Sequence, residues 1–575
     1  MDYKSENKNC QNCKQDFIIE PDDFAFYEKM KVPAPTFCPE CRTQRRLAWR
    51  NERTLYKRKC NAPGHNEDII SVYSSDKSFT VYDHDYWWSD KWDPADFGRD
   101  YDFSKSFFLQ FRELIERVPL INLSVTNMVR CEYCNVSGRD KDCYLISASG
   151  ENEHVMYSNR TVFSKDCSDL YISDNNELCY ELVNCAHCYK AVFSFKCNEC
   201  RNSAFLFDCS NCESCFGCSN LRNKFYYIFN QPYTKEEYLE KIKEFDMGSY
   251  EFIEKTKRKV TKILKGTIRR FAYILKSQNV TGDNIANAKN CKNSFDIVGP
   301  MEDCKHNHWG GANARDCFDC GPGVGFGVEQ AYESFDSGIN GSGLFFNSVV
   351  YGSMNVYYSI NCHSSKNIFG CYGVRKGEYC ILNKKYSKEE YMEIIPKIIK
   401  HMNEFPYIDK NGRVYKYGEF FPVEVSPFSY NETIAQDYIP ITKENALENG
   451  FAWYDSKSRD YSITKKFDDL PDHIKDTPDS VVQEIVECAG STALGCATAF
   501  RITPNELSFY RRMNLPLPHY CFNCRHASRL ARRNPMKLWH RKCMKEGCTN
   551  EFETSYAPDR PEIVYCENCY QQEIY

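Results

Sequence analysis

Small residues recur every twelve positions through the middle of the chain. Positions 131, 143, 155, 167, 179, 191, 203 and 215 read Cys, Cys, Val, Cys, Cys, Ala, Ser and Cys. The clearest repeats are CAHCYKAVFSFK (185–196), CNECRNSAFLFD (197–208) and CSNCESCFGCSN (209–220). A short strict period with stacked small residues and strand-forming segments predicts a β-solenoid. A coil of this solenoid holds either one such repeat, or two repeats that form its two arms.

A looser copy of this pattern follows at an offset of 153 residues. FGCSNLRNKFYYIFNQPYTKEEYLEKI (216–242) matches FGCYGVRKGEYCILNKKYSKEEYMEII (369–395). Thr234 with Glu237, and Ser387 with Glu390, have the spacing of a capping box that begins a helix. We expect these helices to cover the open ends of the solenoids, which otherwise expose unpaired edges.

The remaining segments are less regular. Residues 250–276 read as a basic helix that either extends an anion-binding surface or is a solvated connector. GRVYKYGEFFPVEV (412–425) reads as a hairpin, and VVQEIVEC (481–488) as a helix-like entry to the last module. The predicted domains are a zinc module (1–120), a solenoid with its capping helix (121–249), the basic linker helix (250–276), a second solenoid-like region (277–403), a small α/β segment with an acidic linker (404–485) and a second zinc module (486–575).

The two ends of the chain are copies of one module. CPECRTQRRLAWRNERTLYKRKC (38–60) aligns without gaps on CFNCRHASRLARRNPMKLWHRKC (521–543), at a constant offset of 483 residues. The same offset relates Cys13 to Cys496 and the Phe, Tyr, Met and Pro positions between. This register over some 75 residues predicts one fold used twice.

Each module carries two candidate zinc sites, because a CxxC turn places two thiolates on one metal and a second pair completes a tetrahedron. The first site of the N-terminal module is predicted at Cys10, Cys13, Cys38 and Cys41. In the C-terminal copy, alanine stands at position 493 where Cys10 would align, and Cys488 is the expected replacement. That site therefore consists of Cys488, Cys496, Cys521 and Cys524.

The second site is complete only at the C-terminus, where its expected ligands are Cys543, Cys548, Cys566 and Cys569. The aligned N-terminal positions are Cys60, His65, Asp83 and Tyr86. Cys60 and His65 are zinc-type ligands, Asp83 or His84 is a candidate third, and tyrosine is an unusual one. The alternative is that this copy has lost its metal and folds around the aromatic cluster of Tyr86, Trp87, Trp88 and Trp92.

The segment CQNCKQDF…FYEKMKVPAPTFCPECRTQRR resembles the probable zinc-ribbon, treble-clef-like domains of bacteria. More broadly, RNERTLYKRKC (50–60) and WWSDKWD (87–93) resemble segments of large uncharacterised zinc-ribbon proteins of bacteria with reduced genomes. The resemblance implies zinc modules at both termini that flank Cys-rich repeats, in a multidomain α+β and all-β chain. It implies no established activity, and Asp83 and Tyr86 depart from the CxxC expected there.

The net charge of −5 conceals two basic segments on an acidic body. Residues 42–59 and 525–542 each carry a net charge of +7 by residue count, and both are expected to begin as helices. Guanidinium rows suit phosphate oxygens, which makes nucleic acid, RNA or DNA, a candidate partner. Solvated arginines, or arginines paired with the acidic body, are the alternative. The candidate nucleic-acid-binding residues are Arg42, Arg46, Arg50, Arg53, Arg525, Arg529, Arg533 and Arg541.

The cysteines of the repeats have two interpretations. Buried cysteine is a good small hydrophobe for tight stacking. Alternatively, the adjacent pairs of Cys185, Cys188, Cys197 and Cys200 hold a metal. His306 and His308 lie among further cysteines at a spacing that fits no recognised site, and the HNH triplet at 306–308 is weak evidence for a nuclease.

The start of the chain is polar, and no run of about 18 apolar residues occurs. We therefore expect a cytoplasmic protein with reduced thiols and no membrane partner. The favoured function is a non-catalytic, Zn2+-stabilised nucleic-acid-binding or adaptor protein. The alternatives are a protein-interaction scaffold and an enzyme, either a metal-dependent nuclease or a thiol-redox protein, although no catalytic constellation stands out.

Overall fold

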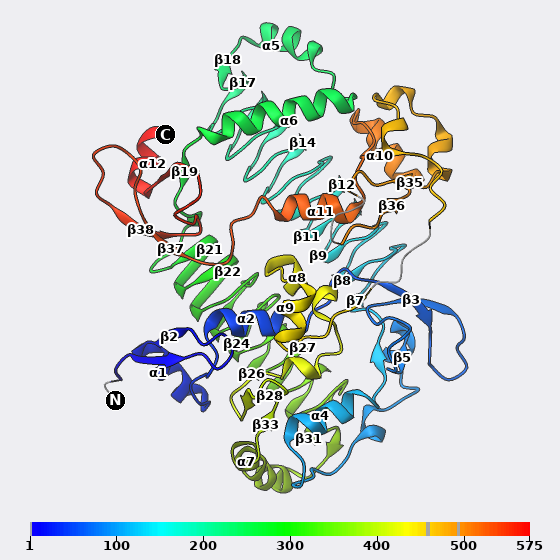
Figure 1. Cartoon of the computed structure of the whole chain (residues 1–575), viewed down its shortest axis with the longest axis vertical. Coiled ribbons are helices and arrows are strands. Elements are labelled where there is room, and N and C mark those ends of the chain that lie inside the picture. The colour runs from blue at the N-terminus through cyan, green and yellow to red at the C-terminus, as the bar shows by residue number, and fades with distance from the viewer. Residues whose placement is uncertain (1–2, 456–460, 491–494) are drawn as a thin grey trace.

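A computed structural model describes residues 3–455, 461–490 and 495–575. Two long stacks of short parallel strands form most of the molecule, one above the other in Figure 1, and the terminal segments lie against them. The first stack comprises residues 125–228 and the second comprises residues 274–385. The chain is therefore mixed α/β, with cysteine clusters near both termini.

The first stack keeps the register of the sequence repeat throughout. A ladder of parallel β-bridges runs from Lys165 through Glu177 and Tyr189 to Arg201, so that each residue pairs with the one twelve positions further on. Comparable ladders run through Tyr180, Tyr171 and Asp174, so parallel ladders recur at every third position of the repeat. Each coil is therefore a single repeat and not a pair of arms. The strands are β7 (Val125–Thr126), β8 (Asn135–Gly138), β9 (Ser147–Gly150), β10 (Glu153–Met156), β11 (Asn159–Val162), β12 (Lys165–Ser168), β13 (Tyr171–Asp174), β14 (Tyr189–Val192), β15 (Arg201–Ala204), β16 (Glu213–Phe216), β17 (Phe225–Ile228) and the antiparallel β18 (Gln231–Pro232).

A repeating triplet explains this register. In one coil, Tyr189 bridges to its neighbours, Lys190 has a left-handed φ of 48°, and Ala191 is fully buried. The left-handed residue bends the chain sharply between two strands or bridges. This conformation is strained for a residue with a Cβ. Backbone hydrogen bonding offsets this strain, since the Lys190 N–H donates to Glu177 O (3.0 Å) in the preceding coil. Every third side chain therefore points inward, which explains the small residues found by sequence.

The second stack is looser. Its pairing offset is twelve between Ser342 and Met354, but thirteen between Met301 and Ala314 and fourteen between Ala314 and Val328. Its strands are β20 (Ile274–Leu275), β21 (Gly282–Lys292), β22 (Ser294–Lys305), β23 (Ala314–Phe318), β24 (Val328–Tyr332), β25 (Phe335–Gly338), β26 (Ser342–Phe345), β27 (Ser348–Tyr351), β28 (Met354–Tyr357), β29 (Ile360–His363), β30 (Lys366–Phe369), β31 (Glu378–Ile381) and β32 (Lys384–Lys385).

Helices follow both stacks as expected. Thr234 and Glu237 form a capping box at α5 (Lys235–Lys241), and Ser387 and Glu390 form one at α7 (Lys388–Glu404). A longer basic helix, α6 (Tyr250–Lys265), then runs along the first stack. The predicted helix over 250–276 is wrong beyond Lys265, because β19 (Arg269–Arg270) pairs with β39 (Val564–Tyr565) of the C-terminal segment.

The terminal modules contain matching elements. The N-terminal elements are β1 (Glu6–Asn9), β2 (Asp16–Ile19), α1 (Pro21–Met30), α2 (Pro39–Leu47), β3 (Tyr56–Lys59), β4 (Asp68–Ser71), β5 (Val81–Tyr82), α3 (His84–Trp88), α4 (Phe107–Ile115) and β6 (Leu120–Ile121). The C-terminal elements are β35 (Val486–Glu487), β36 (Ala499–Phe500), α10 (Pro504–Met513), α11 (Phe522–Leu530), β37 (Trp539–Lys542), β38 (Glu551–Thr554), β39 and α12 (Glu567–Ile574).

The modules dock crosswise. Helix α2 of the N-terminal module lies against the second stack, through Arg42 and Asp319. Helix α11 of the C-terminal module lies against the first stack, through Arg529 and Asp169. The chain thereby folds back on itself, so that each end covers the stack more distant from it in sequence.

The outer half of each module joins the two stacks. At the N-terminus, β5 pairs with β6 just before the first stack, while Arg375 at the end of the second stack donates to Trp87 O (2.8 Å). At the C-terminus, β39 pairs with β19 just before the second stack, and Arg222 at the end of the first stack donates to the Tyr570 hydroxyl (3.0 Å). Each half therefore bridges the end of one stack and the beginning of the other.

Two local predictions in the connecting segment are wrong. The hairpin there is β33 (Tyr407–Ile408) with β34 (Val414–Tyr415), so the turn falls earlier than expected, and 423–425 forms a 3-10 turn. VVQEIVEC is not a helix, because it contains the end of a 3-10 turn followed by β35, which pairs with β36. Short helices α8 (Ile434–Tyr438) and α9 (Lys443–Glu448) complete the segment.

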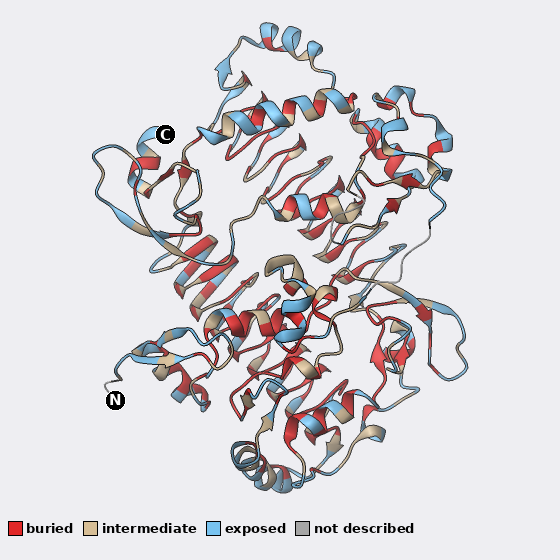
Figure 2. Cartoon of the chain, in the orientation of Figure 1, coloured by how far each residue is buried: buried red, intermediate tan, exposed pale blue. Residues whose placement is uncertain are grey.

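Buried residues concentrate inside both stacks and at the docking helices, as Figure 2 shows. The inward cysteines, leucines and valines form one apolar core in each stack, and a separate aromatic core lies between the second stack and the N-terminal module. Among the helices that the structure describes, none is long and apolar enough to span a bilayer.

Candidate metal centres

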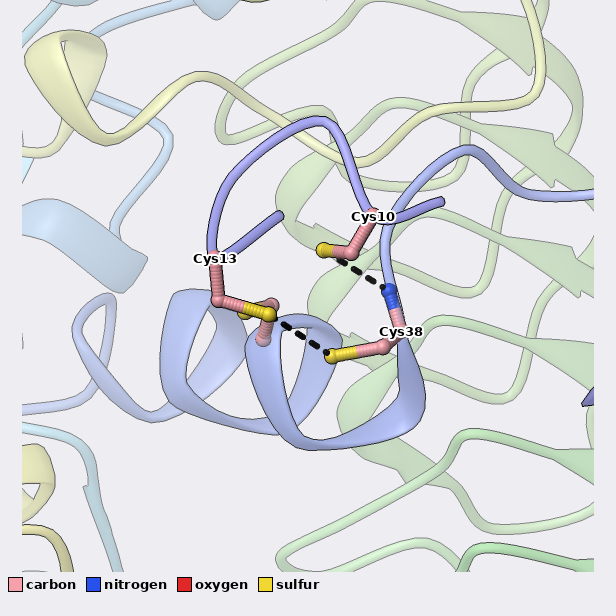
Figure 3. A group of neighbouring side chains, drawn as sticks. Cys10, Cys13 and Cys38 are labelled. Atoms are coloured by element: carbon pink, nitrogen blue, oxygen red, sulfur yellow. Dashed lines mark hydrogen bonds between the residues drawn. The ribbon is translucent and has the colours of Figure 1, made fainter. Parts of the chain in front are cut away.

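Four cysteines converge in the inner half of the N-terminal module. Cys10 and Cys13 come from the turn between β1 and β2, and Cys38 and Cys41 come from the first turn of α2. Figure 3 shows Cys10, Cys13 and Cys38 close together. Their sulfur atoms all lie within 4.8 Å of one another, and Cys13 Sγ is 3.7 Å from Cys38 Sγ. A tetrahedral zinc with Zn–S bonds of about 2.3 Å separates its sulfurs by about 3.8 Å. The geometry therefore fits a four-thiolate site.

The C-terminal module repeats this cluster with one replaced ligand. The sulfur atoms of Cys488, Cys496, Cys521 and Cys524 lie within 4.8 Å of one another. The Cys521 N–H donates to Cys488 Sγ (3.1 Å), as the aligned Cys38 N–H donates to Cys10 Sγ (3.2 Å). Cys488 thus occupies the position in this cluster that Cys10 has in the N-terminal one. The aligned alanine at position 493 lies outside the described residues.

A third cluster lies in the outer half of the C-terminal module. Cys543, Cys548, Cys566 and Cys569 converge in the same way, with Cys548 Sγ 3.9 Å from Cys566 Sγ. Cys566 is the N-cap residue of α12, so the helix holds two ligands on its first turn.

The fourth cluster has mixed donors. Cys60, His65, Glu67 and Asp83 offer ligand atoms within 4.8 Å of one another. Cys60 Sγ lies 3.3 Å from Asp83 Oδ2, and His65 Nδ1 lies 3.1 Å from the same carboxylate. Asp83 is the N-cap of α3, the role that Cys566 has in the other copy. The sequence prediction missed Glu67, whose aligned residue is Asn550, and the only signal for it is its position two residues after His65.

The other residues considered for this site have different roles. Tyr86 is buried, and its ring packs edge-on against His65 with centroids 5.0 Å apart. His84 Nε2 lies 2.8 Å from Val125 O, away from the cluster. The predicted aromatic cluster forms in part: Tyr86, Trp87 and Trp92 pack beside Cys60 together with Tyr82, whereas Trp88 is 40% exposed.

In each four-cysteine site the pKa of one thiol is lowered. The Cys488 thiol lowers the pKa of Cys521 to about 4. Burial opposes ionisation of Cys566, but the Asn550 amide and the backbone of Cys569 outweigh it and lower the pKa to about 6. In Cys10 the pKa is lowered mainly by the Cys38 thiol. The thiolate is the form that binds metal.

Most of the arginines predicted to form exposed rows are buried instead. Arg42 and Arg46 lie against Asp319, and Arg525 and Arg529 lie against Asp169, all with exposed fractions of 6% or less. Arg50 pairs with Glu52 (2.6 Å) and Asp336 (2.7 Å), and Arg533 pairs with Asp296. The prediction of an outward face is wrong for these six because the helices dock on the stacks, and a buried charge requires a partner.

The remaining two arginines are partly exposed. Arg53 lies 3.7 Å from Asp437 and donates to the Asn523 side chain (3.1 Å). Arg541 donates to Ala557 O (3.2 Å) and contacts Met544. Neither belongs to a row of free guanidinium groups.

The structure favours the structural interpretation of the repeat cysteines. Cys185, Cys188, Cys197 and Cys200 are buried inside the first stack, and they are not among the groups of converging ligands found in the described residues. Each thiol instead points at the carbonyl two positions earlier, as Cys197 does at Phe195 O (3.4 Å). Ser203 makes the same bond to Arg201 O (2.7 Å). Cysteine and serine side chains therefore occupy equivalent inward positions in this stack and make the same hydrogen bond.

The histidine pair of the second stack is also structural. His308 is buried beside Thr43, with its Nε2 3.3 Å from Thr43 Oγ1, and it packs against Phe295. Burial lowers the pKa of both His306 and His308 to about 3. The neighbouring Cys304, Cys317 and Cys320 belong to the apolar core. No group of converging metal ligands forms here among the described residues.

These four clusters are the clearest chemical feature of the described chain. Comparison with protein-family models and with curated proteins finds no match.

Proposed function

We infer that the protein is a non-catalytic, zinc-stabilised adaptor, in which two treble-clef-like modules fasten two β-solenoid-like stacks together. The observation that carries this proposal is the position of the ligands beside the docking residues. Cys41 directly precedes Arg42, and Cys524 directly precedes Arg525. A metal that fixes the first turn of α2 or α11 thereby also fixes the arginine that enters the stack.

The donor sets support zinc and a structural role. Three of the clusters offer four thiols at tetrahedral spacing, and four protein ligands leave no open position for a substrate or water. Small modules with little core of their own commonly derive folding free energy from such a site. The outer half of the C-terminal module matches that description, since its core consists of the four cysteines and two partly buried neighbours, Phe552 and Tyr565.

The crosswise docking explains why both ends carry metal. Arg42 of the N-terminal module reaches Asp319, 277 residues away, and Arg529 of the C-terminal module reaches Asp169, 360 residues away. Contacts between such distant segments carry a large loop-closure cost. Modules that metal has already folded leave this closure cost unchanged, but they remove the separate entropic cost of ordering α2 and α11 when they dock.

The proposal is tested by metal analysis combined with hydrogen exchange. We expect purified full-length protein to contain at least three zinc ions per chain. Cys521→Ser is expected to remove about one zinc and to increase amide exchange around Asp169, because α11 no longer docks firmly.

The matched control is Cys209→Ser, which changes a buried cysteine that points at Phe207 O in the stack. It is expected to leave the zinc content and the exchange around Asp169 unchanged. A folded, metal-free wild-type protein, or equal zinc loss in both variants, would overturn the proposal.

A further inference from the structure

Helix α6 presents one mainly basic face, which also carries the exposed Glu251 in its first turn. Its exposed cations are Lys255, Arg258, Lys259, Lys262 and Lys265. On the opposite face Ile253, Thr256 and Val260 are buried. At about 100° per residue, the two groups lie on opposite sides of the helix. The outer face is exposed along its length in Figure 2.

The helix is firmly attached to the first stack. Lys257, between the two faces, lies over the Phe193 ring at 4.8 Å and pairs with Glu254 (3.1 Å) and Glu181 (3.6 Å). At the N-terminus, Ser249 caps the helix and bonds to Asp472 (2.6 Å). The charged face is therefore fixed in place and the apolar face is fully used.

The cations of α6 differ from those of the other basic segments in having few ion-pair partners. The arginines of α2 and α11 are paired with buried carboxylates. In contrast, Lys255, Arg258, Lys262 and Lys265 have no ion-pair partner among the described residues, and Lys259 lies over the Phe229 ring (3.5 Å). The helix dipole accounts for cations in the last turn only, whereas Lys255 and Arg258 lie further from the C-terminus.

We propose that α6 binds the phosphate backbone of nucleic acid. From Lys255 to Lys265 the face measures about 15 Å, which corresponds to about four phosphates of one strand. Four of the five cations are lysines, which act as point charges without a fixed hydrogen-bonding fork, so contacts to the backbone without base reading are expected.

An anionic membrane is the less suitable partner. Helices that lie on membranes bury their apolar face in the lipid, and in α6 that face is occupied by the stack. The proposal rests on the adaptor function inferred above, and it names the class of partner that the adaptor holds.

Binding is tested with the full-length, zinc-loaded protein and two fluorescein-labelled probes, a mixed-sequence 20-nucleotide RNA and a 20-base-pair DNA duplex. The test variant carries Lys255→Glu, Arg258→Glu, Lys262→Glu and Lys265→Glu. The control carries the same charge change on exposed lysines on or beside α7, through Lys385→Glu, Lys388→Glu, Lys397→Glu and Lys400→Glu.

We expect wild-type affinity for at least one probe to fall steeply with salt, with a slope in the log–log plot of about −3 to −4. The α6 variant is expected to lose affinity by at least about 30-fold at low salt, and the α7 control by less than about 3-fold. A second variant, with glutamine at the same four α6 positions, keeps the helix intact and is expected to lose most of the affinity.

Three results would overturn the proposal: no binding of either probe by the wild type, equal binding by the α6 variant, or equal losses in the α6 and α7 variants. Binding of phosphatidylserine vesicles in preference to both probes would identify a membrane surface instead. Zinc content, measured on the same samples, reports on the adaptor proposal separately, so failure of one is distinguishable from failure of the other.

Discussion

Arg42 Nη2 and Asp319 Oδ2 lie 2.8 Å apart, and both side chains are almost completely excluded from solvent, with exposed fractions of 3% and 0%. The aligned Arg525 of the other module lies 3.1 Å from Asp169 in the same way. Both arginines also donate to the carbonyl of the residue before the CxxC, Phe37 O and Tyr520 O. The two modules therefore dock on different stacks by the same contact.

Removing one partner of this pair is expected to be costly. In Asp319→Asn, Arg42 and Arg46 lose their shared carboxylate while remaining buried. We expect a loss of about 3–5 kcal/mol in the free energy of unfolding, measured by urea denaturation.

The matched control for that prediction is Asp316→Asn, at a nearby position of the same stack. Asp316 pairs with Lys29 (2.8 Å), whose side chain is 49% exposed. A pair of this kind contributes about 1 kcal/mol or less. Similar losses in both variants would contradict the docking role of Asp319.

The four metal clusters are expected to differ in affinity. The mixed Cys60, His65, Glu67 and Asp83 site has two carboxylates and one thiol, a weaker set for zinc than four thiolates. Under stepwise dialysis against a chelator, we expect this site to empty first, leaving three zinc ions per chain. Glu67→Gln is expected to accelerate the first loss alone. If all metal leaves in one step, the distinction between the sites is wrong.

Serine is expected to replace cysteine inside the first stack at little cost. In Cys200→Ser, the new hydroxyl can donate to Asn198 O, as the thiol does now at 3.5 Å, and as Ser203 does to Arg201 O. We expect a change in unfolding free energy of about 1 kcal/mol or less, with zinc content unchanged. A fall in zinc content would show that the stack itself holds metal.

Acidification is expected to weaken the docking of the N-terminal module. Burial opposes ionisation of Asp319 and Glu52, but Arg42 and Arg46 at Asp319, and Arg160 and Arg50 at Glu52, lower both pKa values to about 2. Groups with lowered pKa stabilise the fold above their unfolded values of 3.8 and 4.5, and this stabilisation is lost as the pH falls towards 2. Glu333 opposes the trend in part, because burial raises its pKa.

The measurement is the difference in unfolding free energy between wild type and Asp319→Asn at pH 6 and at pH 3. Metal loss in acid affects both proteins, so the difference isolates the carboxylate. We expect it to shrink at the lower pH. A difference that stays constant would show that ionised Asp319 does not stabilise the fold.

The sequence by itself determined the local features of this protein. Cys38 and Cys41 are separated by only two positions, and a spacing of that kind brings two thiols together whatever the rest of the chain does. The twelve-residue period likewise limited the coil of the first stack to one or two repeats, because each coil pairs only with its neighbours, and the structure shows one. Constant offsets of 483 and 153 residues likewise revealed the duplicated modules and the two capping boxes, because two copies of a local pattern keep the same internal spacing wherever they lie in the chain.

Only the tertiary structure decided how these parts meet. Arg46 and Arg529 read in the sequence as members of exposed basic rows, yet both are 1% exposed, because their helices dock on stacks hundreds of residues away. Glu67 joins a metal cluster only because hairpin β3–β4 places it beside Asp83. Spacing along a chain determines contacts within a turn or between neighbouring repeats. The partner of a buried charge depends instead on long-range packing, which local sequence patterns do not predict.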